Sequence, residues 1–256
     1  MFKGEARDGL YFGLEIETDC GSARSFSREC GEMFGDVMYY KSDGSLSCDG
    51  VECVTHPMSY DYAMGFDWDA FHSIACDNDM RSHDTNSCGF HIHVSRDGLG
   101  SSRDERELTA AKMVLFFDHY RSELLKFSRR KSRYANEWAR SNNADIKRDD
   151  SKSLAYSKAV DSSNASRYCA VNLRNEHTVE VRLWRGTTNP DTIRATIDLT
   201  NAIVQYCKTT SLADLCEPET LFDCLHKLVD DKTIGYMTLR GINPEFDLPR
   251  IDGEND

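Results

Sequence analysis

Long apolar runs are missing from this chain of 256 residues. No run approaches the roughly 18 consecutive apolar residues that a membrane-spanning helix needs. The opening stretch, MFKGEARDGLYFG, also lacks an apolar core of signal-peptide length. We therefore expect a soluble, cytoplasmic protein with no membrane partner.

Basic charge is in short supply as well. The chain has 31 Lys and Arg against 43 Asp and Glu, a formal net charge of -12. Proteins that bind nucleic acid need a basic surface for the phosphate backbone, so nucleic acid is not an expected partner. The length suits one large domain or two small ones, and we expect a single domain over 1–256, with a polar insertion or lid at about 141–166 and an acidic tail at about 244–256.

Several signature motifs are also absent. The chain has no GxxxxGK[ST] loop, no GxGxxG loop and no protein-kinase signature, so a glycine-rich loop does not hold a nucleotide here. None of the ten cysteines forms a CxxC pair, which argues against a zinc ribbon or a thioredoxin-type site. We expect most of these thiols to be small buried side chains.

The pattern of apolar residues predicts a mixture of strands and helices. Strands are expected within 10–18, 37–46, 50–57, 88–95 and 167–186. Helices are expected within 25–34, 62–76, 102–128, 189–207 and 219–229. Ser102 and Glu105 form a capping-box pattern, and Pro190 suits the first turn of the helix that follows it.

Four of these strands share one pattern of alternation. In CGFHIHVS, the apolar residues point to one face of the strand, and His91 and His93 point to the other. The polar face of GLEIET carries Glu15 and Glu17. The remaining polar positions of this kind are Glu52 in GVECVTHP and Glu180 with Arg182 in TVEVRLW.

A sheet face in water is the ordinary explanation for one such strand. Glutamate, however, is depleted in strands, and here the polar positions of the four strands are almost entirely Glu, His and one Arg. If the strands share a sheet, four carboxylates meet one guanidinium, and they repel unless cations lie among them. Carboxylate oxygens and waters suit Mg²⁺ or Mn²⁺, while imidazole also suits Zn²⁺. Metal ions beside an arginine are the groups that stabilise phosphoryl transfer.

The order GLEIET, DGSL…GVECVTHP, CGFHIHVS and RYCAVNL…TVEVRLWRGT resembles the amidoligase family. That family belongs to the superfamily of glutamine synthetase and glutamate–cysteine ligase, and the resemblance covers about residues 10–200. It implies an α+β fold in which a curved antiparallel sheet has helices on its outer face and the active site on its inner face. It also implies a ligase in which ATP phosphorylates a carboxylate and an amine attacks the acyl phosphate.

The resemblance also implies roles for individual residues. The implied ligands for Mg²⁺ or Mn²⁺ are Glu15, Glu17, Glu52, His91 and Glu180. The implied catalytic residues are Arg182, Glu180 and His93. The implied contacts to ATP are Arg182, His93, Arg167, Asn172, Arg129 and the other arginines of 129–133. Asp43 and Ser45 match a turn that would touch the substrate, although a plain Asp-Gly turn explains them equally well.

Three functions remain open from the residues alone. The first is an ATP- and metal-dependent ligase that joins a carboxylate to an amine, with an amino acid, peptide or protein as substrate. The second is a metal-dependent hydrolase or oxygenase that uses His91, His93 and one carboxylate. The third is a non-catalytic acidic protein that binds a basic partner, which would spread the acidic residues over an outer surface.

Overall fold

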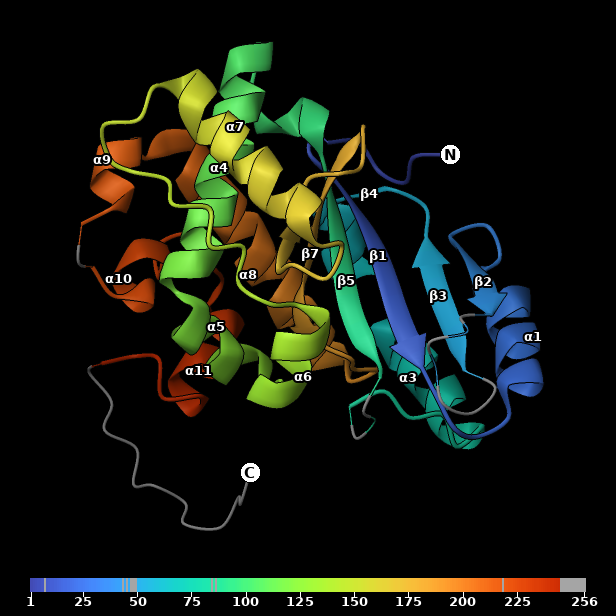
Figure 1. Cartoon of the computed structure of the whole chain (residues 1–256). Coiled ribbons are helices and arrows are strands. Elements are labelled where there is room, and N and C mark those ends of the chain that lie inside the picture. The colour runs from blue at the N-terminus through green and yellow to red at the C-terminus, as the bar shows by residue number, and fades with distance from the viewer. Residues whose placement is uncertain are drawn as a thin grey trace.

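An open, curved antiparallel sheet forms the centre of the molecule (Figure 1). The computed structural model describes residues 1–6, 8–42, 44, 46, 50–83, 85, 87–217 and 219–244. Within these residues the strand order is β2-β3-β1-β5-β7-β6, and β4 pairs with β1. The bounds are β1 Tyr11–Thr18, β2 Met38–Ser42, β3 Val51–Thr55, β4 Met58–Ser59, β5 Gly89–Ser95, β6 Val171–Asn172 and β7 Thr178–Arg185.

The central strands divide their side chains between an apolar face and a polar face. On β1, the side chains of Phe12, Leu14 and Ile16 are completely buried. The matching apolar residues of β5 and β7 are equally buried and join the same core. In Figure 1, helices α3 and α8 lie behind the sheet, whereas α4, α5 and α7 stand beside its β6–β7 end. The predicted α+β class is therefore confirmed, with helices packed on the apolar face.

The helices surround this sheet on one side and at one end. Their bounds are α1 Ala23–Phe34, α2 Tyr60–Gly65, α3 Trp68–Asp77, α4 Arg103–His119, α5 Arg121–Ser128, α6 Ser132–Trp138, α7 Lys152–Ala165, α8 Pro190–Thr209, α9 Leu212–Leu215, α10 Leu221–Leu225 and α11 Asp231–Leu239. A 3-10 turn, η1, covers Arg96–Leu99. The pattern of the sequence did not predict α6, α9 or α11, which are short.

Two predicted helix starts are present in the structure, but one helix predicted as continuous is broken. The Ser102–Glu105 capping box is present at the start of α4, and Pro190 lies in the first turn of α8. The single helix predicted at 62–76 is wrong. The chain leaves the helical conformation at Phe66, and the Asp67 side chain then accepts a hydrogen bond from the Ala70 N–H to begin α3.

The polar segment 141–166 also differs from its prediction as a long loop or a loosely helical lid. Its second half forms the 14-residue helix α7. The side chains of Ala155, Ala159 and Ser163 are buried, so α7 packs closely beside α4. Small residues build this contact, and a count of large apolar residues therefore missed it.

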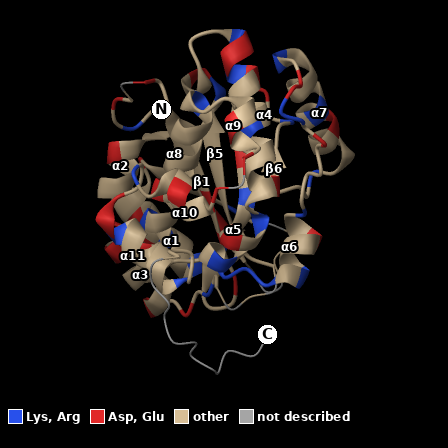
Figure 2. Ribbon diagram, turned by 90° about the vertical axis from the view of Figure 1, so that its left-hand side faces the viewer, with Lys and Arg blue, Asp and Glu red and all other residues tan. Residues whose placement is uncertain are grey.

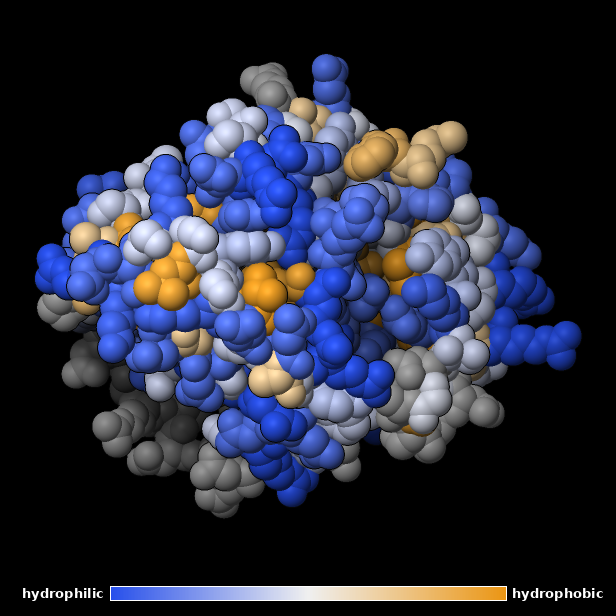
Figure 3. Space-filling view, turned by 45° about the horizontal axis from the view of Figure 1, so that its top comes forward, coloured by the Kyte–Doolittle hydropathy of each residue, from blue (hydrophilic) through white to orange (hydrophobic). Residues whose placement is uncertain are grey.

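The surface of the molecule is largely polar. The face in Figure 3 is mainly hydrophilic, and its apolar side chains form small separate patches. No helix among the described residues is both long and apolar enough to span a bilayer. Of the nine cysteines that the structure describes, six are buried, as the sequence predicted. The predicted acidic tail lies outside the described residues beyond 244.

Candidate active site

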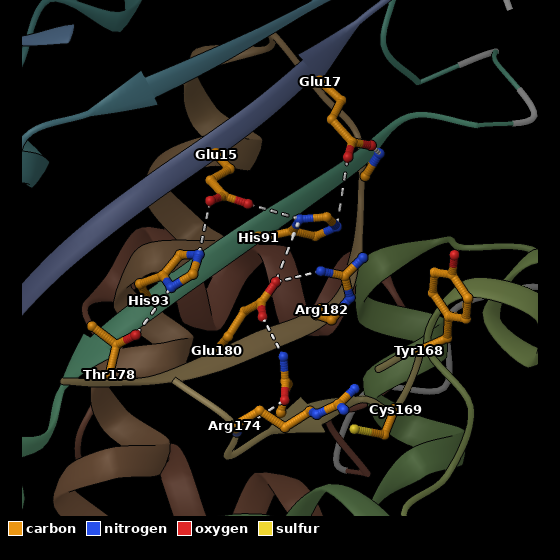
Figure 4. Close-up of polar contacts among 12 residues, drawn as sticks. Glu15, Glu17, His91, His93, Tyr168, Cys169, Arg174, Thr178, Glu180 and Arg182 are labelled. Carbon is orange, nitrogen blue, oxygen red and sulfur yellow. Dashed lines mark hydrogen bonds and ion pairs between the residues drawn. The ribbon is translucent and has the colours of Figure 1, made fainter. Parts of the chain in front are cut away.

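Charged side chains from three neighbouring strands meet on the polar face of the sheet (Figure 4). Strand pairing places Glu15 opposite His91 on β5, and His93 opposite Glu180 on β7. Alternation along each strand brings the remaining polar residues to the same side. We call this group the inner cluster, and its members are Glu15, Glu17, His91, His93, Glu180 and Arg182.

The His91 ring lies among three carboxylates. Its Nδ1 atom is 3.2 Å from a Glu15 oxygen and 3.9 Å from a Glu180 oxygen. Its Nε2 atom is 4.0 Å from a Glu17 oxygen. The second histidine, His93, places its Nε2 atom 3.0 Å from the other Glu15 oxygen. Glu15 therefore bridges the two imidazoles.

Three members of the cluster have the spacing of a metal site. One ligand atom from each of Glu15, His91 and Glu180 lies within 4.8 Å of the other two. Ligands about 2.1 Å from one ion lie at most about 4.2 Å apart, so small side-chain movements would bring all three onto one cation. Two carboxylates and one imidazole suit Mn²⁺, Mg²⁺ or Zn²⁺. The described residues therefore fit the metal ion that the resemblance implies.

The charges of the cluster stabilise one another despite their burial. Burial acts to raise the pKa of Glu15, but hydrogen bonds from His91 and His93 outweigh it, so the pKa is lowered. Burial acts to lower the pKa of His93, but Glu15 raises it above its ordinary value. Glu180 keeps a lowered pKa against burial because Arg182 and both histidines lie near it. These carboxylates are therefore ionised near neutral pH.

Glu52 lies beside the cluster on the neighbouring strand β3. Pairing of β1 with β3 puts it opposite Glu17, and Lys41 lies 3.8 Å away. Burial raises its pKa, and the negative charge of Glu15 raises it further. Glu52 therefore lies on the same face of the sheet as the inner cluster, but it is not one of the three residues with the spacing of metal ligands.

Arg182 is held against Glu180. Its Nη1 atom donates a hydrogen bond to one Glu180 oxygen, and Asn172 Nδ2 donates to the other oxygen at 2.7 Å. A β-bulge in β7 sets Arg182 and Leu183 opposite His91. The buried Nε atom of Arg182 has no hydrogen-bond partner among the described residues. This guanidinium therefore retains a donor for a bound group.

Two further residues position the histidines, and the sequence analysis named neither. Thr178 Oγ1 lies 3.2 Å from His93 Nδ1, so it helps to fix the ring. The Gly89 N–H donates to Glu17, and a Cβ atom at Gly89 would lie 2.7 Å from His91 Nε2. Thr178 shares the strand face of Glu180, which is the signal that could have identified it.

A pocket of about 270 Å³ opens beside the inner cluster. Glu17, His91 and Arg182 line one side of it. Its other lining residues include Arg167, Asn172, Tyr168, Trp138 and Arg130. The predicted Arg167 and Asn172 are therefore present at this site. We call it the cluster pocket.

Arg130 is the most buried cation of this site. It is 6% exposed, and its Nη1 donates to the carbonyl oxygens of Arg182 at 2.6 Å and of Trp184 at 3.2 Å. Burial lowers its pKa to about 10, so it remains charged at neutral pH. Arg130 is one of the arginines of 129–133 that were predicted to contact ATP, whereas its neighbour Arg129 lines a different pocket. Arg129 therefore does not line the cluster pocket, and its predicted contact with ATP stays a prediction.

The predicted substrate contacts cannot be placed in this site. Asp43 and Ser45 lie outside the described residues. The other residues predicted for metal, nucleotide or catalysis lie in or beside the inner cluster and its pocket, except Arg129 and Arg133, which line a neighbouring pocket. Residues far apart in the sequence therefore meet at this site, as expected if their strands share the polar face of one sheet.

Several solved structures resemble this fold at low sequence identity. A bifunctional glutathione synthetase from Pasteurella multocida matches with a TM-score of 0.46 and 12% identity, over 91% of this chain and 46% of that one. Apo GmaS matches with a TM-score of 0.48 and 14% identity, over 91% and 68%. The ligase PafA, in complex with the prokaryotic ubiquitin-like protein Pup, matches with a TM-score of 0.41 and 12% identity, over 97% and 61%. This chain thus spans less than half of the glutathione synthetase, and likeness at this level does not establish a function.

No curated protein matches the sequence. A family model described as "Putative amidoligase enzyme" matches residues 32–204, which is more than half of the chain and includes β3, β5 and β7 of the site. The chain therefore belongs to the amidoligase family of carbon–nitrogen ligases, as the order of its strand motifs predicted.

Proposed function

We propose that this protein is an ATP- and divalent-metal-dependent ligase that forms an amide through an acyl phosphate. The carboxylate and the amine would come from an amino acid, a peptide or a protein. One observation carries the proposal: the ligand atoms of Glu15, His91 and Glu180 lie within 4.8 Å of one another beside Arg182. This grouping supplies both the cation site and the guanidinium that phosphoryl transfer needs.

The residues of the inner cluster have distinct roles in this proposal. Glu15, His91 and Glu180 would hold one divalent cation, and Glu17 with Glu52 would supply oxygens for a second. Cations bound there would neutralise phosphate oxygens. His93, fixed between Glu15 and Thr178, would face the nucleotide.

Arginines of the cluster pocket would bind the anionic groups. Arg182 would donate its unpartnered Nε–H to the transferring phosphoryl group, where negative charge spreads over three oxygens. Arg130 and Arg167 would hold the remaining phosphates or the carboxylate to be activated. Arg130 is already ordered by two backbone carbonyls, so it would lose little freedom when a ligand binds.

A screen for ADP release tests this proposal. Amino acids and peptides would be combined with ammonia and amines in the presence of ATP and either Mg²⁺ or Mn²⁺. We expect ADP release that depends on both substrates and is lost in EDTA, with an amide product detected by mass spectrometry. The matched control is Glu180→Gln, which keeps the shape but removes one ligand charge. Equal ADP release by this variant and the wild type, or ADP release without a carboxylate substrate, would contradict the proposal.

The hydrolase or oxygenase alternative is less well supported by the geometry. A facial triad of that kind uses two histidines and one carboxylate. Here the closest group has one histidine and two carboxylates, and both nitrogens of His93 face other residues. Four glutamates of the strands, Glu15, Glu17, Glu52 and Glu180, share the inner face of the sheet, which a binding protein with a negative outer surface would not need.

We also propose that the stretch 141–151 closes over the bound nucleotide. It joins α6 to α7 and follows Trp138, which lines the cluster pocket. Limited proteolysis should cut this stretch more slowly when Mn²⁺ and a non-hydrolysable ATP analogue are present. Equal rates of cutting with and without them would leave it without such a role.

A further inference from the structure

A buried serine connects α7 to the inner cluster. Ser163 lies in the last turn of α7, and its side chain is completely buried. Figure 2 shows α7 beside α4, as Figure 1 does. A serine hydroxyl inside a helix can bond back to its own helix, as Ser162 does by donating to the Ala159 carbonyl oxygen at 2.8 Å. Ser163 instead bonds across to Asn172 in β6 and to Leu173 after it.

These contacts fix the direction of the hydrogen bonds around Asn172. Ser163 Oγ accepts a hydrogen bond from the Leu173 N–H at 2.7 Å, which leaves its hydroxyl hydrogen to donate to Asn172 Oδ1 at 3.3 Å. Asn172 Oδ1 also accepts from the Arg174 N–H at 3.0 Å. A backbone N–H can only donate, so this contact requires the oxygen of the amide to lie on this side.

The nitrogen of the Asn172 amide therefore faces Glu180. Pairing of β6 with β7 puts Asn172 opposite Glu180, and Asn172 Nδ2 donates to Glu180 Oε2 at 2.7 Å. The second oxygen, Oε1, accepts from Arg182 and lies 3.9 Å from His91 Nδ1. The two oxygens of Glu180 thus have different surroundings. The amide holds Oε2, and Oε1 lies on the side of His91, where the proposed cation would bind.

A rotated Asn172 amide would remove this support. Its oxygen would then face Glu180, and two acceptors cannot form a hydrogen bond. The Ser163 hydroxyl opposes this rotation because it donates to the amide oxygen. Groups that hydrogen-bond to metal ligands orient them, and their loss typically weakens metal binding by about 10–100-fold.

We infer that Ser163 and Asn172 position Glu180 for the cation, and that the metal affinity of the site is coupled to the packing of α7. This inference rests on the metal site of the proposed function and adds a means of regulating it. Ser163 is a positioning residue, because it acts through Asn172. Coupling is reciprocal, so a bound cation must also stabilise the contact between α7 and β6.

Two neighbouring serine variants test the inference. Ser163→Ala removes the hydroxyl that orients Asn172, whereas Ser162→Ala removes a hydroxyl that bonds within its own helix. Calorimetry would measure Mn²⁺ binding, and chemical denaturation of the metal-free proteins would measure stability. We expect Ser163→Ala to weaken Mn²⁺ binding by about threefold or more, and Ser162→Ala to bind Mn²⁺ like the wild type.

A serine with only a structural role would lower stability without changing metal affinity. Wild-type affinity for Mn²⁺ in folded Ser163→Ala would therefore overturn the inference, whatever its stability. An equal loss of affinity in Ser162→Ala would also overturn it, because any disturbance of α7 would then have the same effect.

A double-mutant cycle tests whether Ser163 acts through Asn172. Asn172→Ala removes the donor to Glu180, and we expect it to weaken Mn²⁺ binding by about 10–100-fold. Adding Ser163→Ala should then cause no further loss of affinity, because the amide that Ser163 orients is gone. The same loss from Ser163→Ala in both backgrounds would overturn the inference.

Hydrogen exchange on the wild type tests the reciprocal effect without depending on the folding of a Ser163 variant. Saturating Mn²⁺ should slow the exchange of backbone amides in α7, and this protection should be largely lost in Asn172→Ala. Exchange in α7 of the wild type that does not respond to Mn²⁺ would overturn the coupling.

These outcomes separate the inference from the ligase proposal. If Ser163→Ala weakens Mn²⁺ binding but the wild type releases no ADP with any substrate pair, the ligase proposal fails and the positioning role is supported. If the wild type forms an amide but its Mn²⁺ affinity does not depend on Ser163, the positioning role fails and the ligase proposal stands. A wild type that does not bind Mn²⁺ would overturn both.

Discussion

Arg182 and Glu180 are neighbours on one strand face with opposite proposed tasks. Arg182→Lys keeps the positive charge but loses the planar fork and the free Nε–H. We expect nucleotide binding to survive while turnover falls by about 10²–10³-fold, the cost of losing one donor to a transition-state charge. Steady-state kinetics and nucleotide titration would separate these two effects.

The variant Glu180→Gln tests the proposed metal ligand next to Arg182. It should weaken Mn²⁺ binding, and its activity should partly return at high metal concentration, which Arg182→Lys should not show. Both variants should remain folded because neither removes apolar burial. Wild-type turnover in Arg182→Lys would end the assignment of that residue to phosphoryl transfer.

Glu52 provides a test that depends on pH and not on activity. Burial and the charge of Glu15 raise its pKa, so the folded protein holds this proton more tightly than the unfolded chain does. Ionised Glu52 therefore lowers stability above its folded pKa. We expect Glu52→Gln to raise the melting temperature of the metal-free protein at pH 7. That gain should disappear as pH falls below the ordinary carboxyl pKa of about 4.3.

Glu32→Gln on α1 is the matched control, because Glu32 is exposed and lies outside the inner cluster. It should leave the melting temperature nearly unchanged at every pH. Loss of the exposed Lys41 contact should matter little in Glu52→Gln, since such pairs contribute little. A lower melting temperature for Glu52→Gln at pH 7 would show that Glu52 is not repelled by its neighbours.

Sequence reasoning at the residue scale worked wherever strand alternation applied. It placed Glu15, His91 and Glu180 on one face because each residue follows the period of two along its strand. Arg130 follows no such period. It lies between two helices in a run of basic residues, and only the packed structure shows which member of that run is buried.

At the scale of elements, α7 shows how small residues replace large ones in a helix contact. Ala159 is completely buried in this helix. Ala159→Leu would push α7 away from α4 and should lower the free energy of unfolding by about 1–3 kcal/mol, the usual cost of overpacking. Chemical denaturation would measure this loss.

Asn164→Leu introduces the same side chain at an exposed position of α7. It should leave the free energy of unfolding within about 0.5 kcal/mol of the wild type. Equal stability of the two leucine variants would mean that α7 is not tightly packed against α4.

The same element explains where prediction of the fold was limited. The strands and α8 could be predicted because their apolar residues recur at a clear period, and the start of α4 could be predicted from its capping box. The contacts of α7 rest on Ala and Ser, which give no such signal. The break between α2 and α3 depends on the conformation of Phe66 and the cap at Asp67, which a continuous helical pattern concealed.

At the scale of the whole molecule, binding should appear as stability. Mn²⁺ with a non-hydrolysable ATP analogue at 100 times the dissociation constant should stabilise the folded protein by about 2.7 kcal/mol. For a chain of this size, we expect the melting temperature to rise by about 5–10 °C. Glu15→Gln should show a smaller rise because it loses one metal ligand. An unchanged melting temperature in the wild type would count against the ligase proposal.

Net charge illustrates what whole-chain properties conceal. A balance of -12 correctly indicates an acidic protein, but it gives no sign of the three arginines, Arg130, Arg167 and Arg182, that line the cluster pocket. Composition averages over the chain, whereas a site depends on which residues the fold gathers in one place.

The three closest ligand residues of the inner cluster also have a consequence for folding. Glu15, His91 and Glu180 come from strands that lie near the start, the middle and the later part of the chain. Such non-local pairings form slowly because the chain between two strands must first close into a loop, which costs conformational entropy. A metal ion can therefore recognise the protein only once β1, β5 and β7 are paired. Mn²⁺ would therefore bind in the last step of folding, and the bound ion would slow the first step of unfolding.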